Sequence, residues 1–331
     1  MDGNVSKKTF SHKFFKLPFN RENTFISIKK LLTNRLCSIL DLYLQSLNLS
    51  IDIQFFASAL ELKIVVLELP IEQISYNIGL EIVLLTSQSA QIIYRCHVVR
   101  ALASYLKIAP ETVAINLVEL LDFGSSNNKY ESSFDLKIEI TKSGRIDFLL
   151  SSLSLSNWLQ QSLLSTQVTN IAKDNVVGKV LQLHQTPRDL FSVQYVRARC
   201  CSLLDLAVRE KLVIREDNLN YSPWQLSRSQ SIPWLDAENN LWFKNISELN
   251  AIANLLTITD LFDRQSIDWH KQAINFSQTT SIFLTECRFL GAVKYQYPQL
   301  AIARLGLIML CQYWLARISI EKLNIAAPTS L

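Results

Sequence analysis

The sequence predicts an α+β fold for the first half of the chain and an all-helical bundle for the second half. The first half contains short apolar runs with the alternation of β-strands, and between them lie segments with helical periodicity. From about residue 190 onward, nearly all apolar residues recur at helical spacing, with breaks near residues 218–240 and at Pro298. We therefore expect helices beside a small antiparallel sheet, followed by a bundle of roughly four to six helices.

Composition sets the class of protein. The 331-residue chain is 49% hydrophobic and 19% charged, which allows it to bury a sizeable core. Its net charge of +4 permits an acidic partner such as RNA without requiring one. The scattered cysteines form no CxxC pair, which indicates reduced, buried thiols in a cytoplasmic protein. The longest apolar run, residues 300–316, is shorter than the ~20 residues of a membrane span and predicts a buried helix instead.

The domain organisation follows from these changes in pattern. Residues 1–24 are expected to form a loose basic lead-in, and residues 25–164 an α+β domain. Residues 165–190 are expected to be a linker, part of which is helical. Residues 191–331 then form the helical domain.

The first expected elements are three helices and a strand. Residues 25–47 have helical periodicity, whereas the β-branched run at residues 62–69 predicts a strand. Residues 91–107 place their apolar side chains on one helical face and predict a second helix. Pro110 then suits the first turn of a third helix, and Glu111 suits the positive end of its dipole.

A hairpin and a further helix complete the α+β domain. After a polar loop at residues 124–133, residues 134–140 alternate strictly between apolar and polar, as a half-buried strand does. The turn at residues 142–145 leads into a run that is expected to pair back as a hairpin. Residues 156–164 predict a helix with Ser156 or Asn157 as its cap.

Recognisable catalytic motifs are missing from the sequence. There is no GxxxxGK[ST] or GxGxxG phosphate loop, no GxSxG elbow and no HExxH helix. The adjacent Cys200 and Cys201 diverge on any helix and cannot clamp one tetrahedral metal. The four histidines lie far apart and are read as incidental: His12, His97, His184 and His270. We therefore predict no catalytic residues, no metal, no cofactor and no small-molecule substrate.

Three stretches of the helical half resemble the DALR-type anticodon-binding domain of class I arginyl-tRNA synthetases. "VQYVRARCCSLL" at residues 193–204 is similar to the family's opening Gln-Tyr-Ala-His-Ala-Arg helix, with an Arg in place of the His. "IFLTECRFLGA" at residues 282–292 is similar to the family's "FxxFYxxCRV" helix. Residues 303–331 resemble its closing helix, and "LNIAAPTSL" echoes the usual ending without its terminal Met. The matching positions are Gln194, Tyr195, Ala198, Arg199, Phe283, Cys287 and Arg288.

A shorter likeness lies in the first half. "SGRIDFLLSSLSLSNWLQQSL" at residues 143–163 is similar to the "GFINFRLS…WL" segment that closes the family's N-terminal domain. In the full synthetase a catalytic domain follows that segment, but only about 25 residues separate the two halves here, far fewer than the ~100 that a catalytic domain needs. No HIGH-like or KMSKS-like motif is present. The chain thus resembles a synthetase without its catalytic domain.

The resemblance implies a protein that binds tRNA of the arginine type through its helical domain and does not aminoacylate by itself. Proteins read unstacked anticodon bases with aromatic faces, arginine planes and hydrogen bonds. The candidate RNA-binding residues are Gln194, Tyr195, Arg197, Arg199, Arg288, Arg304, Tyr313, Trp314 and Arg317. Arg197 and Arg209 are expected to face solvent, whereas Val196, Cys200 and Leu203 are expected to face the core.

Two other functions remain open at this point. The mild net charge and the missing terminal Met favour a protein-interaction module that kept the fold but lost RNA binding. The chain is also consistent with the tRNA-binding subunit of a split arginine-tRNA ligase, in which a partner protein supplies the catalytic half. On any of these hypotheses the aromatic residues are equally compatible with the helical core, where most aromatic residues at helical spacing are buried.

Overall fold

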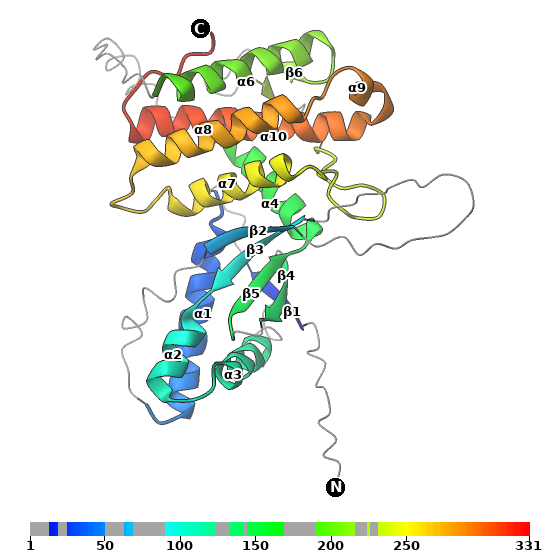
Figure 1. The fold of residues 1–331 in the computed structure, drawn as a ribbon. Coiled ribbons are helices and arrows are strands. Elements are labelled where there is room, and N and C mark those ends of the chain that lie inside the picture. Colours follow the sequence, from blue (N-terminus) through cyan, green and yellow to red (C-terminus); the bar gives the residue numbers. More distant parts are fainter. Residues whose placement is uncertain are drawn as a thin grey trace, which may run out of the picture. The chain divides into compact units, whose positions relative to one another are not determined.

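The computed structural model describes residues 13–18, 25–49, 63–68, 90–123, 133–141, 144–168, 190–215, 224–225 and 231–331. Over these ranges the chain is mostly helical and contains a small antiparallel sheet, as predicted (Figure 1). Close contacts divide the chain into two units. The first lies within Met1–Asn20, Ile28–Val65 and Ile92–Ser154, and the second within Arg21–Ser27, Val66–Gln91 and Leu155–Leu331.

The sheet has five strands in the order β1-β4-β5-β3-β2. The β1–β4, β4–β5 and β5–β3 pairs are antiparallel. The predicted hairpin is confirmed, because Ile140 of β4 pairs with Ile146 of β5. Along β4, Phe134, Leu136 and Ile138 are buried, which is the expected half-buried alternation. The strand bounds are β1 (Lys13–Pro18), β2 (Lys63–Glu68), β3 (Ala90–Cys96), β4 (Ser133–Ile140) and β5 (Ile146–Leu150).

Two expectations for this region are wrong. Residues 13–18 do not form a loose lead-in, because they pair with β4 as an edge strand of the sheet. Residues 91–107 do not form one helix, because β3 occupies their first part and α2 (Val98–Leu106) their second. A short apolar run fits the periodicity of a helix and that of a strand equally well. Here the β-branched and aromatic residues Ile92, Ile93 and Tyr94 favour a strand, and pairing with β5 provides its partner.

Arg95 lies on strand β3 directly opposite Asp147 of β5. Its Nε and Nη2 donate to the two carboxylate oxygens of Asp147 over 2.8 and 2.7 Å. The Asp147 residue is buried, so this bidentate pair supplies the partner that a buried carboxylate needs. The hydrogen bond with Asp147 raises the pKa of Arg95.

The other helices of the first unit agree with the sequence. α1 (Ile28–Ser46) occupies the predicted range, and α3 (Pro110–Phe123) begins at the predicted proline. Gly144 holds the start of β5 against that proline, with φ of +71° and no space for a side chain. A Cβ at Gly144 would lie 2.6 Å from the Cβ of Pro110, so both the backbone angle and the close approach require glycine.

Helices dominate the rest of the described chain. α4 begins four residues before the predicted helix and ends inside the expected linker. Its cap is also not the predicted Ser156 or Asn157. The Oγ of Ser151 instead accepts a hydrogen bond from the N–H of Ser154 in the first turn of the helix. The loop at 124–132 and the linker residues 169–189 lie outside the described ranges. The helices are α4 (Ser152–Val168), α6 (Phe191–Arg209), α7 (Ile246–Leu261), α8 (Trp269–Glu286), α9 (Ala292–Gln296) and α10 (Pro298–Arg317).

Helix α10 is the central element of the second unit. It contacts α6, α7, α8 and α9, and its residues from Leu305 to Ala316 are all buried. A π-helical turn, η3 (Ile318–Lys322), continues it. The combined segment Pro298–Lys322 is the one helix in the described ranges that is long and apolar enough to cross a membrane, but 78% of its apolar window is buried inside the fold. That burial is typical of a core helix.

Gly306 lets the segment at residues 231–245 lie against α10. A Cβ at Gly306 would overlap Ile232 Cδ1 and would lie 2.6 Å from Cη2 of Trp234. Both neighbours are held in place by Oε1 of Gln160 on α4, which accepts hydrogen bonds from the N–H of Ile232 over 3.2 Å and from Nε1 of Trp234 over 3.1 Å.

Substitution of Gly306 by Ala is expected to lower the free energy of unfolding by about 1–2 kcal/mol. The overlap with fixed side chains outweighs the gain of up to ~1 kcal/mol in helix propensity. Urea unfolding followed by circular dichroism measures the change. Adding Ile232→Val, which removes the overlapping methyl group, should restore part of the loss. A Gly306→Ala variant more stable than the wild type would contradict this packing.

Candidate functional site

The predicted RNA-binding residues come mainly from α6, α10 and the end of α8, which contact one another. The structure separates them into three groups with different surroundings. Only some of their side chains reach the surface.

The first group lies in the first two turns of α6, and two of its members point inward. Nε2 of Gln194 donates to the carbonyl oxygen of Ala326 over 2.9 Å, and Nη1 of Arg197 donates to the carbonyl oxygen of Ala327. Both residues are buried, so the expectation that Arg197 faces solvent is wrong. These polar side chains instead bind the backbone of the C-terminal tail, residues 324–331, to α6. Val196 and Cys200 are buried as expected, Leu203 is half-buried and Arg209 is exposed.

The other face of α6 presents aromatic rings to solvent. Tyr195 is 49% exposed and Phe191, one turn before it, is 55% exposed. Their rings stack with centroids 6.4 Å apart. Arg199 follows one turn later, is partly exposed, and makes no ion pair within the described part of the chain. Residues four apart share a helix face, so Phe191, Tyr195 and Arg199 form one line, the α6 stripe.

Phe191 was not among the residues singled out from the sequence. Its spacing of four from Tyr195 and four more to Arg199 was the available signal. The resemblance that directed the choice of residues begins at Val193, so Phe191 lay just outside the stretch from which candidates were taken.

The second group is buried among aromatic rings. Tyr313 and Trp314 are each 1% exposed, and Phe25 contacts both, with ring centroids 5.4 and 4.7 Å away. The guanidinium of Arg317 lies 4.2 Å from the ring centroid of Phe262, and its Nε pairs with Glu321 over 2.7 Å. Tyr313 and Trp314 therefore do not offer a face to an RNA base in this structure, and Arg317 is committed to internal contacts.

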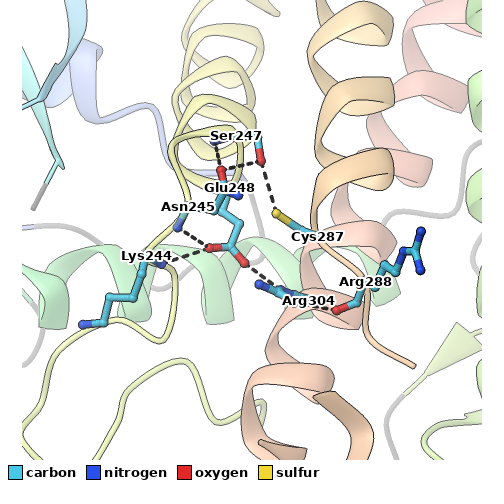
Figure 2. Close-up of polar contacts among 7 residues, drawn as sticks. All are labelled: Lys244, Asn245, Ser247, Glu248, Cys287, Arg288 and Arg304. Atoms are coloured by element: carbon cyan, nitrogen blue, oxygen red, sulfur yellow. Dashed lines mark hydrogen bonds and ion pairs between the residues drawn. The ribbon is translucent and has the colours of Figure 1, made fainter. Parts of the chain in front are cut away.

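The third group belongs to a polar cluster around Glu248, at the start of α7 (Figure 2). One carboxylate oxygen accepts from the N–H groups of Lys244 and Asn245, each over 2.9 Å. The other accepts from Nε of Arg304 over 2.7 Å. Nη1 of Arg304 also donates to the carbonyl oxygen of Arg288 over 2.5 Å. Arg304 thus serves an internal ion pair instead of the surface role predicted for it.

Arg288 differs from Arg304 because only its backbone belongs to the Glu248 cluster. Its residue is exposed, and Figure 2 shows the side chain pointing away from Glu248. Arg288 joins Tyr195 and Arg199 as the predicted residues whose side chains reach solvent without an internal ion pair in the described ranges. The nine predicted residues therefore do not form one continuous surface.

The cysteines are packing residues. Five of the six are buried, as predicted, and Cys37 is half-buried. Burial raises the pKa of Cys201 and of Cys287 to about 11 and that of Cys311 to about 12, and it raises the pKa of Cys200 well above its ordinary value. A thiol with a raised pKa is a poor nucleophile and a poor metal ligand near neutral pH. Within the described ranges, no three His, Cys, Asp or Glu residues are grouped as metal ligands.

Comparison of the chain with protein-family models, with curated proteins and with solved structures finds no match in any of the three.

Replacing Glu248 by Ala is expected to lower the free energy of unfolding by about 3–5 kcal/mol, because Arg304 is then left as a largely buried cation without its partner. Glu248→Gln should cost less, since its amide oxygen still accepts from the two N–H groups. Urea denaturation measures both. The control is Glu139→Ala in the partly exposed Lys137–Glu139 pair, expected to cost at most ~1 kcal/mol. Equal losses at Glu248 and Glu139 would refute the structural role of this cluster.

Thiol labelling tests the burial of the cysteines. With an aromatic disulfide reagent at pH 8, we expect at most one thiol of the folded protein, Cys37, to react rapidly, and all six to react in denaturant. A Cys37→Ser variant should lose the rapid phase. Two or more rapid thiols would contradict the packing.

The buried cysteines also make the free energy of unfolding depend on pH. Folding raises the pKa of Cys201 and of Cys287 from 9.0 to about 11. The contribution of these thiols to the free energy of unfolding is therefore complete below pH 9 and declines as the pH rises toward about 11.

Proposed function

We propose that the protein binds tRNA of the arginine type through its helical half and does not aminoacylate it alone. On this proposal the chain is an α+β domain followed by a DALR-like anticodon-binding bundle, resembling an arginyl-tRNA synthetase without its catalytic domain. The bundle presents RNA with a surface made of aromatic faces and cations.

The α6 stripe is the observation that carries the proposal. Tyr195 and Phe191 expose stacked rings, and an exposed ring pair is a platform on which unstacked bases bind, at ~1–3 kcal/mol per base. Arg199 adds a cation one turn along the same face, suited to a phosphate or to stacking on a base. Anticodon bases are single-stranded, so they have the faces that such a platform requires.

The packing of the resembling stretches also supports the proposal. The three stretches fall on α6, on the end of α8, and on α10 with the tail, and these three helices contact one another. The tail returns to the first turns of α6, where it meets Gln194 and Arg197. The stretches therefore belong to one bundle, with the α6 stripe on the outside of the turns that hold the tail.

A protein-interaction module remains the second candidate. The observation that favours it is the burial of Gln194, Arg197, Tyr313 and Trp314, four of the nine residues expected to meet RNA. An exposed aromatic pair also suits a protein partner, since aromatic residues are enriched at protein interfaces. The tRNA-binding subunit of a split ligase is a variant of the first proposal, because it uses the same surface together with a catalytic chain.

The double substitution Phe191→Ala/Tyr195→Ala is expected to weaken binding to total tRNA at least about tenfold at ~50 mM salt, because it removes the stacking platform. Filter binding or fluorescence anisotropy measures the affinity. Tyr105→Ala on α2 is the matched control, because Tyr105 is also 49% exposed. Arg199→Ala should make the dependence of affinity on salt shallower, since one cation is lost.

The result that would sink the RNA proposal is an absence of tRNA binding by the wild-type protein in low salt. Binding that survives Phe191→Ala/Tyr195→Ala would place the RNA contact away from the α6 stripe. The interaction module would be favoured if the wild type copurifies with a protein and no RNA, and if Phe191→Ala/Tyr195→Ala loses that protein.

A further inference from the structure

A second cluster of exposed aromatic and cationic side chains lies at the opposite end of α6 from the stripe. Tyr295 on α9 is 79% exposed, and Tyr297, which follows α9, is 52% exposed. Arg209 and Lys211 at the end of α6 are exposed, as is Arg288 after α8. These five residues and Lys294 are called the α9 patch. Arg209, the last residue of α6, lies about 21 Å from Tyr195 along the helix axis, given ~1.5 Å per residue, and the Lys294–Glu210 ion pair places α9 beside that end of α6.

The α9 patch is held in place by contacts with the bundle. Nζ of Lys294 pairs with Oε2 of Glu210 over 2.7 Å, which joins α9 to the residue that follows α6. Gly291 enters α9 with φ of +67°, and Pro298 begins α10 directly after Tyr297. The carbonyl of Arg288 is fixed by Arg304, as Figure 2 shows. The segment that carries the two tyrosines is therefore fixed to the bundle on both sides.

Exposed cations outnumber carboxylates among the residues at the end of α6 and between α8 and α10. Lys294 neutralises Glu210, and exposed Glu286 adds one further carboxylate. Against these stand Arg209, Lys211 and Arg288, which make no ion pair within the described ranges. The patch thus carries a net positive charge beside two exposed tyrosines. Nζ of Lys294 lies 5.7 Å from the ring centroid of Tyr295, which remains 79% exposed. It also lies in the same unit as the α6 stripe.

We propose that the α9 patch is a second nucleic-acid site, which binds single-stranded RNA by stacking bases on Tyr295 and Tyr297 and by contacting phosphates with Lys211 and Arg288. Single-stranded nucleic acid is recognised by this combination of aromatic platforms and backbone cations. Duplex RNA is recognised mostly through its shape and offers no base faces to a tyrosine. The excess of cations favours a polyanion over a neutral protein surface, and unstacked bases give the two rings a stacking partner.

This inference rests on the RNA-binding part of the proposed function and extends it to a second stretch of the same RNA. Two sites beside the two ends of α6, with about 21 Å of helix between Tyr195 and Arg209, would hold one RNA at two points. Affinity then rises through effective concentration, without any new contact at the α6 stripe. The two sites can be tested separately because they share no residue.

Photocrosslinking locates the site on the full-length protein. The probe is an oligouridine of about 12 nucleotides, within the site size of single-strand binders, substituted with 5-iodouridine, which crosslinks to aromatic side chains under long-wavelength light. Peptide mass spectrometry then identifies the crosslinked residue. We expect crosslinks at Tyr295 or Tyr297 in the wild type. These should be lost in Tyr295→Ala/Tyr297→Ala and unchanged in Tyr105→Ala, which removes a 49% exposed tyrosine elsewhere.

Affinity for the same probe, measured in the Phe191→Ala/Tyr195→Ala background, isolates the α9 patch. Tyr295→Ala/Tyr297→Ala should weaken binding about tenfold or more, whereas Tyr295→Phe/Tyr297→Phe, which keeps both rings, should stay within about twofold. Lys211→Ala/Arg288→Ala should make the slope of log affinity against log salt shallower by about 1.4. Polyglutamate at equal charge should not displace the probe.

Each outcome decides between the two proposals. Crosslinks confined to the α6 stripe would overturn the α9 patch and leave the proposed function standing. Crosslinks confined to Tyr295 or Tyr297 would support the patch and count against the stripe. Displacement by polyglutamate, or equal affinity of the Ala and Phe pairs, would show an anion-binding or protein-binding surface without stacking and would overturn the inference. Absence of any crosslink would overturn both sites.

Discussion

The ion pair between Glu248 and Arg304 is the interaction on which the arrangement of the second unit depends. Glu248 caps the start of α7, Arg304 lies on α10, and Arg304 also holds the carbonyl of Arg288 just after α8. One carboxylate therefore fixes the relation of three helices. Because the pair is largely buried, neither charge can be satisfied by solvent if its partner moves. The position of Arg288 in turn sets where the chain leaves α8 and begins the corner that carries Tyr295 and Tyr297.

Helix α10 provides the surface against which the other helices arrange themselves. Its buried residues from Leu305 to Ala316 face every side of the helix, so it offers no single buried face, and the hydrophobic effect alone does not orient α6, α7 and α8 around it. Directional contacts do so instead: Glu248 with Arg304, Gln160 with Ile232 and Trp234, and the tail carbonyls with α6. Rings around Arg317 close the far end of α10. α10 and the tail cover one face of α6, and this leaves the α6 stripe exposed on the opposite face.

Residue periodicity predicted most of the elements but not which polar side chains they bury. Strict alternation identified β4, and proline placement identified the start of α3. Residues 91–107 were misassigned because Ile92 and Ile93 fit a helical face as well as a strand until β5 supplies a partner. The inward orientation of Arg197 depends on the carbonyl of Ala327, which is 130 residues away and invisible to any local pattern. Tyr313 and Trp314 read equally as surface or core, and packing by Phe25 decides for the core.

The docking of the tail on α6 has a consequence for the order in which the bundle forms during synthesis. Arg197 is made 130 residues before the carbonyl of Ala327 that binds it. At ~5–20 residues per second this separation corresponds to a delay on the order of 10 s. Throughout that interval α6 carries a guanidinium and an amide on its inner face with no tail to receive them, so a ribosome-bound chain keeps this face hydrated. The inner face of α6 therefore completes its hydrogen bonds only after the tail has been synthesised.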